Sequence, residues 1–300
     1  MPNHLTMKKF LFLGFAAFVS AALLSYTLKP KDQILTPECY ISCFESDMFA
    51  EFQREAATTD FANMHDNPLP FVYEDQKGSM ITFKTSDGQD GQAYFIPAKK
   101  KSNKYLLVIQ EWWGLNDYVK KESDWYWDEL DKEANVLALD MYDGKVATTR
   151  DSAQKYVQGI KNDRLVNIIK GAIAYGGEDA EISTLGWCFG GAWSLQASII
   201  AGKQGRAGVM FYGRPETNID RLKMLNADII GFFGSKDKSP SPEMVDAFEK
   251  NMKEAGKNLT VHRYEAGHGF ANPSNPNFDE AATKDARKKA VEFLQKRIDD

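Results

Sequence analysis

The stretch Gly-Trp-Cys-Phe-Gly-Gly at residues 186–191 decides the fold, because it joins a short apolar run to a helix-forming run. Its glycines allow a sharp turn from strand to helix and close packing of the two. Such a turn lifts the central side chain, Cys188, out at the carboxyl end of the strand, onto a helix N-terminus whose partial positive charge favours the thiolate. The pattern predicts a nucleophilic cysteine. It leaves open a buried structural cysteine beside a tight turn.

Apolar runs alternate with helix-forming stretches on both sides of this turn. We expect buried parallel strands at residues 105–110, 136–139, 182–185, 207–211 and 229–233, with a last strand at 259–264. We expect helical stretches at residues 117–134, 149–175, 190–201, 242–255 and 279–298. Two alternating runs, 80–85 and 92–96, predict a β-hairpin. An α/β fold with a doubly wound, mostly parallel sheet and an N-terminal β-hairpin therefore accounts for one domain at residues 78–300.

An acid and a base follow the cysteine in the order expected of an α/β-hydrolase. Asp237 comes directly after the strand at 229–233, and His268 comes shortly after the strand at 259–264. His268 would accept or share the thiol proton, and Asp237 would orient the imidazole and stabilise its charged form. His262 is a competing base, but it lies inside the expected strand, so we favour a structural role for it.

The residues after the strand at 105–110 are suited to an oxyanion loop. The backbone N–H groups of Trp112 and Phe189 could converge on the developing oxyanion. Glu111 would then stand near the thiol and hold its proton or gate its orientation, unless it only favours the start of the next helix. We expect an aromatic substrate pocket, although each of its candidates could equally be core packing: Trp112, Trp113, Tyr142, Trp187 and Phe270.

Together, Glu111-Trp112, the elbow around Cys188, Asp237 and His268 resemble the dienelactone hydrolase family of α/β-hydrolases over about residues 78–300. The resemblance implies a cysteine hydrolase that opens an enol lactone through an acyl-thioenzyme. Family members acting on anionic dienelactones are expected to hold the substrate carboxylate with two arginines. Here one of those positions is Asn272, and the loop at 140–144 supplies no arginine. We therefore expect a small neutral ester or lactone as the substrate.

The composition of the chain limits the classes of protein to which it can belong. With 37 basic and 42 acidic residues the chain has a net charge of -5, which excludes the basic field that nucleic acid would require. Three cysteines cannot form a disulfide scaffold, and no Cys/His cluster has zinc-ligand spacing, so we expect no metal. The predicted chemistry needs no cofactor. The competing hypothesis is a non-catalytic exported binding protein that keeps the hydrolase fold as a scaffold.

The N-terminus indicates export. Lys8 and Lys9 precede an uncharged run at residues 10–24, which is the order of a secretory signal. The run extends to residue 28, so a retained membrane anchor is also open, as is a buried helix of a cytosolic protein. We expect residues 1–28 to be a signal peptide or anchor, and the rest to be periplasmic or to face outward from the membrane, attached only through this end.

Residues 29–77 are mostly polar without a clear period, and we interpret them as a leader or lid segment of unassigned role. Cys39 and Cys43 lie in this segment, and an oxidising compartment would allow them to pair. So short a loop makes the bond geometry demanding, and two free thiols are the alternative.

Overall fold

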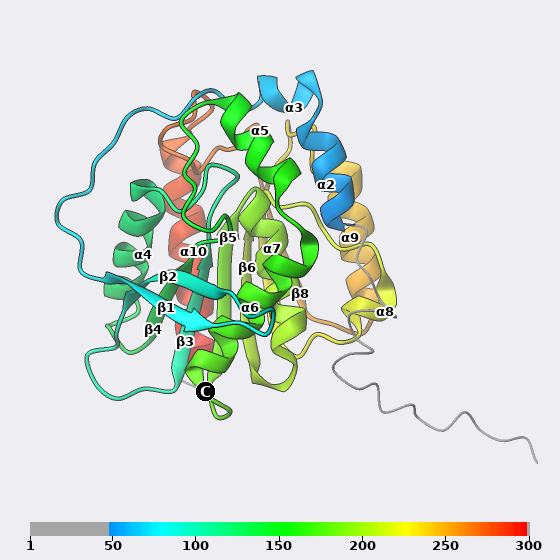
Figure 1. Cartoon of the computed structure of the whole chain (residues 1–300). Helices are drawn as coiled ribbons and strands as arrows, with labels where there is room; N and C mark the ends of the chain where they lie inside the picture. The colour runs from blue at the N-terminus through cyan, green and yellow to red at the C-terminus, as the bar shows by residue number, and fades with distance from the viewer. Residues whose placement is uncertain (1–47, 299–300) are drawn as a thin grey trace, which may run out of the picture. The chain divides into compact units, whose positions relative to one another are not determined.

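The structure is a computed structural model that describes residues 48–298 (Figure 1). The chain divides into two units, Met1–Cys43 and Phe44–Asp300, and the fold below is that of the second. Its strands are β1 (Ser79–Lys84), β2 (Asp90–Ile96), β3 (Lys104–Ile109), β4 (Asn135–Leu139), β5 (Glu181–Trp187), β6 (Gly205–Phe211), β7 (Asp228–Gly234) and β8 (Leu259–Tyr264).

These strands form one eight-stranded sheet in the order β1-β2-β4-β3-β5-β6-β7-β8. The hairpin of β1 and β2 is antiparallel, β2 pairs antiparallel with β4, and the pairs from β4 through β8 are parallel. The central strands are apolar because both of their faces are covered. The expected doubly wound α/β sheet with an N-terminal hairpin is confirmed.

The helices of the hydrolase fold are α4 (Asp117–Glu129), α5 (Arg150–Gly159), α6 (Asn162–Gly176), α7 (Phe189–Ala201), α8 (Ile219–Leu222), α9 (Pro242–Glu254) and α10 (Glu280–Ile298). Helices α6 and α7 pack on each other and on the sheet, whereas α10 packs on β6 and β7 and α4 on β2 and β4. Figure 1 shows these two pairs of helices on opposite faces of the sheet. The sheet is thus covered on both faces, as its composition requires.

Two helical expectations need correction. The stretch at 149–175 is two helices, because Ile160 (φ -82°, ψ 142°) and Lys161 (φ -94°, ψ 145°) are extended between α5 and α6. Helix α4 ends at Glu129, before the expected Ala134, because Asp131 and Lys132 have positive φ values of 53° and 63°. A left-handed backbone cannot continue an α-helix.

Two further helices lie within the range expected as a leader: α2 (Met48–Ala56) and α3 (Thr59–Asn63). Helix α2 buries one apolar face made of Met48, Phe49, Phe52 and Ala56. It is fastened by Arg214, whose guanidinium contacts the carboxylates of Glu51 at 2.7 Å and Glu55 at 3.0 Å. Residues 48–65, which we call the N-terminal cover, are therefore packed on the hydrolase domain.

Within residues 48–298, no helix is both long enough and apolar enough to cross a bilayer. The expected signal peptide or anchor at residues 1–28 lies outside the described residues, as do Cys39 and Cys43.

Candidate active site

Cys188 occupies the turn between β5 and α7 in a strained conformation, with φ 53° and ψ -115°. A non-glycine residue rarely adopts a positive φ, so the surrounding structure must impose it. A close backbone contact near Cys188 involves Gly190, where an added Cβ would lie 2.1 Å from the carbonyl oxygen of Ile109. The first turn of α7 thus rests directly on the end of β3. This contact brings the loop after β3 beside the thiol.

His268 and Asp237 form a buried pair after β8 and β7. The Nδ1–H of His268 donates to Oδ2 of Asp237 at 2.8 Å, and the other carboxylate oxygen accepts the Ser239 amide at 2.9 Å. Burial lowers the pKa of His268, but Asp237 and Cys188 outweigh it and raise that pKa well above its ordinary value. The second ring nitrogen, Nε2, is buried without a hydrogen-bond partner among the described residues.

The cysteine thiol lies next to this imidazole. Sγ of Cys188 and a ring nitrogen of His268 belong to a buried group of atoms that all lie within 4.8 Å of one another. Burial raises the pKa of the thiol, and the neighbouring His268 opposes that rise. Three of the expected site residues, Cys188, Asp237 and His268, therefore meet at the carboxyl edge of the sheet.

Glu111, at the end of β3, is held by two neutral donors. The Tyr212 hydroxyl donates to one carboxylate oxygen at 3.0 Å, and Nδ2 of Asn272 donates to the other at 2.6 Å. Burial raises the pKa of Glu111, while His268 and these two donors lower it in part. Asn272, which stands where an arginine was expected, thus binds a carboxylate of the chain itself.

The expected aromatic residues divide into two groups. All of them are buried, and Trp112, Tyr142 and Phe270 do not line the pocket beside Glu111. The Tyr142 ring lies 5.5 Å from that of Phe189. The Tyr142 hydroxyl is buried without a partner among the described residues. Phe189 is the first residue of α7, so its N–H has no partner within the helix and is free to point toward the thiol.

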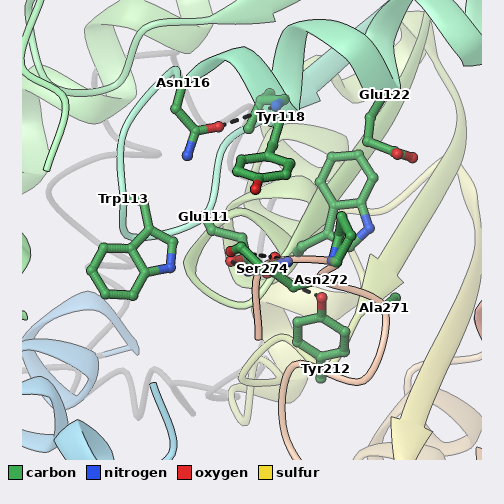
Figure 2. Close-up of a pocket in the computed structure, with 12 residues that line it drawn as sticks. Glu111, Trp113, Asn116, Tyr118, Glu122, Tyr212, Ala271, Asn272 and Ser274 are labelled. Atoms are coloured by element: carbon green, nitrogen blue, oxygen red, sulfur yellow. Dashed lines mark hydrogen bonds between the residues drawn. The ribbon is translucent and has the colours of Figure 1, made fainter. Parts of the chain in front are cut away.

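A pocket opens beside Glu111 and carries the other expected aromatic residues, Trp113 and Trp187 (Figure 2). Its remaining lining residues are Asn116, Tyr118, Val119, Glu122, Tyr212, Ala271, Asn272, Pro273 and Ser274. Cys188 and His268 do not line it, but the Tyr212 ring in its wall lies 5.1 Å from the His268 ring. Glu111 and Tyr212 therefore stand between the pocket and the thiol.

The sequence matches the dienelactone hydrolase family over residues 92–298. The chain belongs to this family. It is 26% identical over 227 residues to carboxymethylenebutenolidase 1 of Cupriavidus pinatubonensis, a match covering 70% of this chain and 92% of that one. The carboxymethylenebutenolidase of a Pseudomonas strain is also 26% identical, over 228 residues, with 70% and 91% covered.

Among solved structures, a dienelactone hydrolase-like promiscuous phosphotriesterase from metagenomic libraries superposes with a TM-score of 0.59. It is 21% identical, and the match covers 73% of this chain and 99% of that one. This likeness shows the fold. The expected α/β-hydrolase architecture and the resemblance to dienelactone hydrolases are both confirmed, and with them the expectation of a dienelactone hydrolase-like enzyme.

This member of the dienelactone hydrolase family places a second histidine at the thiol, which the sequence did not reveal. Nε2 of His65 lies 3.5 Å from Sγ of Cys188, and Nδ1 lies 2.8 Å from the carbonyl oxygen of Phe61. Because a carbonyl only accepts, Nδ1 carries the ring proton and Nε2 offers a lone pair to the thiol. Burial lowers the pKa of His65 well below its ordinary value, which keeps the ring neutral.

Only a weak sequence signal could have found His65. It follows α3, whose N-cap Thr58 accepts a hydrogen bond from the Phe61 amide, and a lone histidine after a short helix has no spacing that marks it. Its ring stacks on that of Phe61 at 4.2 Å and lies 4.7 Å from that of His268. The competing base of the sequence analysis, His262, lies instead in β8, stacked on Phe232 at 5.5 Å.

Proposed function

We propose that this chain is an exported cysteine hydrolase that cleaves small neutral esters or lactones through Cys188, His268 and Asp237. The observation that carries the proposal is the buried Asp237–His268 hydrogen bond of 2.8 Å beside a thiol held in a strained turn. A nucleophile, a base and a group that orients the base are the parts that acyl transfer requires.

The reaction follows from the positions of the protons. Asp237 holds the proton on Nδ1 of His268, so Nε2 accepts the proton of the Cys188 thiol as sulfur attacks the substrate carbonyl. The N–H groups of Phe189 and Trp112 stabilise the oxyanion. His268 then returns the proton to the leaving oxygen, which leaves an acyl-thioenzyme. Water, deprotonated by His268, releases the acid and restores the thiol.

The charge of the pocket supports a neutral substrate. Two carboxylates, Glu111 and Glu122, line it, and its described lining includes no lysine or arginine. Glu122 pairs with Arg287, so the support comes from Glu111, which is held by the neutral donors Tyr212 and Asn272. The nearby cations are engaged elsewhere, since Arg150 pairs with Asp66 and Lys145 lies over the Tyr156 ring at 5.8 Å. The carboxymethylenebutenolidases resemble this chain, but a substrate carboxylate would find no arginine in this pocket to hold it.

The role of Cys188 is tested with purified protein and an activated neutral ester. We expect Cys188→Ala to abolish hydrolysis while the unfolding temperature changes little, because the turn tolerates a small side chain. Cys188→Ser should lose most activity, since a hydroxyl needs a stronger base than a site suited to a thiol provides. His262→Gln, on β8, is the matched control and should hydrolyse the ester like the parent.

Activity of Cys188→Ala close to that of the parent would overturn the assignment. A parent protein that binds an ester without cleaving it would favour the alternative, a binding protein on a hydrolase scaffold.

We also propose export, which is supported by the two lysines ahead of the uncharged run at residues 10–24. A fusion of residues 1–35 to a reporter should carry the reporter across the membrane. A mature chain that starts beyond Ala21 would identify a cleaved signal, and an intact N-terminus in the membrane fraction would identify an anchor. A reporter that stays in the cytoplasm would contradict the proposal.

A further inference from the structure

A group of three metal-binding side chains surrounds the thiol. His65, Cys188 and His268 each direct one ligand atom into a space where all three atoms lie within 4.8 Å of one another. All three side chains are buried, with exposed fractions of 2%, 2% and 3%. The ligands come from the N-terminal cover, the turn before α7 and the loop after β8, so their spacing in the sequence has none of the regularity of a zinc motif.

We propose that His65, Cys188 and His268 form a reversible binding site for a zinc-class divalent ion, which blocks the nucleophile when it is bound. One thiolate and two imidazoles are ligands that zinc prefers, and three protein ligands leave a fourth position for water.

The distances suit this ion. Tetrahedral zinc with bonds of about 2.3 Å to sulfur and about 2.0 Å to nitrogen separates those two ligand atoms by roughly 3.5 Å. The observed separation of Sγ of Cys188 and Nε2 of His65 is 3.5 Å. The third ligand, on His268, needs only a small adjustment from its present place within 4.8 Å of the other two atoms.

The atoms around the ligands are also those of a metal site. Metal-binding histidines almost always donate their second ring N–H to a carboxylate or a backbone carbonyl. Here His268 donates to Asp237 at 2.8 Å, and His65 donates to the Phe61 carbonyl at 2.8 Å. Both Nε2 atoms are thereby left to face the sulfur. That of His268 is buried and interacts with the Cys188 thiol and with no other partner among the described residues, so both of these atoms are available to one ion.

The charge balance favours a cation. When the metal binds, the Cys188 thiol and the Nε2 of His268 each release to solvent any proton they hold, and the ion, the thiolate and two neutral imidazoles together carry one positive charge. The carboxylates of Asp237 and Glu111 lie nearby in the same buried region. No electron is transferred. A sulfur bound to the metal no longer attacks a carbonyl, so the loss of activity rests on the proposed function, whereas the site itself does not.

The test uses the full chain carrying Cys39→Ser and Cys43→Ser, in which Cys188 is the remaining cysteine. After reduction and treatment with a chelator, the protein is titrated with Co²⁺, which reports a thiolate ligand by a charge-transfer absorption band. We expect the band to saturate at one equivalent and Zn²⁺ to displace Co²⁺. In the same background, Cys188→Ser should lose the band, and His65→Gln should weaken binding by at least tenfold.

His262→Gln is the matched control, and it should bind Co²⁺ like the parent. Ester hydrolysis is measured before and after adding Zn²⁺, and again after adding the chelator; we expect loss and full recovery. Absence of a saturable band, or equal Co²⁺ affinity in a folded His65→Gln variant, would overturn the site. A protein that shows the band with Co²⁺ but cleaves no ester in its metal-free form would leave the site intact and contradict the proposed function. Circular dichroism establishes that each variant is folded.

Discussion

Asn272 has a side chain whose nitrogen and oxygen both form hydrogen bonds within the chain. Its Nδ2 donates to Glu111 at 2.6 Å, and its Oδ1 accepts from the amide and the hydroxyl of Ser274, both at 2.8 Å. The amide therefore fixes the Glu111 carboxylate, and because it is neutral it cannot give a substrate carboxylate the two charge-assisted hydrogen bonds of an arginine. At this position the chain differs from a binding site for a substrate carboxylate.

The prediction for Asn272 concerns the choice between neutral and anionic substrates. We expect kcat/KM for a neutral ester to equal or exceed that of a carboxylate-bearing analogue of similar size, because Glu111 lines the pocket beside neutral donors and the other lining carboxylate, Glu122, already pairs with Arg287. The measurement is a direct comparison of the two substrates. An anionic preference of tenfold or more, about 1.4 kcal/mol of transition-state binding, would show that a cation such as Lys145 or Arg150 reaches the substrate after all.

The position of helix α7 depends on small residues at its first turn, and Gly190 has one of the shortest of these approaches. A Cβ at Gly190 would lie 2.1 Å from the Ile109 carbonyl oxygen and 2.3 Å from that of Gln110, both of them backbone atoms that cannot move aside cheaply. We expect Gly190→Ala to lower the free energy of unfolding by about 3 kcal/mol. Thermal unfolding measures the loss.

Gly159, at the end of α5, is the matched control, because an added Cβ there meets nothing within 4 Å. Gly159→Ala should be neutral or stabilise by about 0.5 kcal/mol, since alanine favours the helix and restricts the unfolded chain. Equal unfolding temperatures for the two variants would show that the turn relaxes around the extra methyl group.

Helix α2 depends on Arg214, which joins Glu51 and Glu55 on one side of the helix. Half-buried ion pairs of this kind stabilise by about 1 kcal/mol in total, and losing them should raise the population of an opened cover about fivefold. We therefore expect Arg214→Ala to accelerate modification of Cys188 by a thiol reagent about fivefold, in the background without Cys39 and Cys43.

Arg263→Ala is the control for this experiment. Arg263 also joins two carboxylates, those of Asp246 and Glu249, but it does so on β8 and α9. Its removal should leave the modification rate unchanged. If both variants react like the parent, the ion pairs of Arg214 do not hold the cover closed.

At the scale of the whole molecule, the sheet could be predicted because the strands from β3 to β7 are short, mostly apolar runs separated by helices. The break at Ile160 and Lys161 was not predicted, since neither residue type stops a helix by itself, yet both are extended in the structure. The residues of the proposed triad could be predicted, because each comes shortly after the end of a strand. His65 could not, because its place depends on contacts 123 residues away along the chain.

The sequence of the N-terminal cover contains one pattern that predicts its structure. Met48, Phe49, Phe52 and Ala56 recur at helical spacing and form the buried face of α2. The polar residues between them hid this period within the range assigned to a leader. What the sequence does not state is the partner of that face, an aromatic group that includes Phe189 and Trp193.

The N-terminal cover contacts residues far along the chain, and this affects when it can pack during synthesis. Its contacts join Met64 to Asn275, Glu51 to Arg214 and His65 to Cys188, and these three partners lie 123 to 211 residues later in the chain. A ribosome delivers the cover first and most of its partners much later. In a newly made chain the thiol is therefore unprotected until nearly the whole sequence has emerged, and enclosing it belongs to the last stage of maturation.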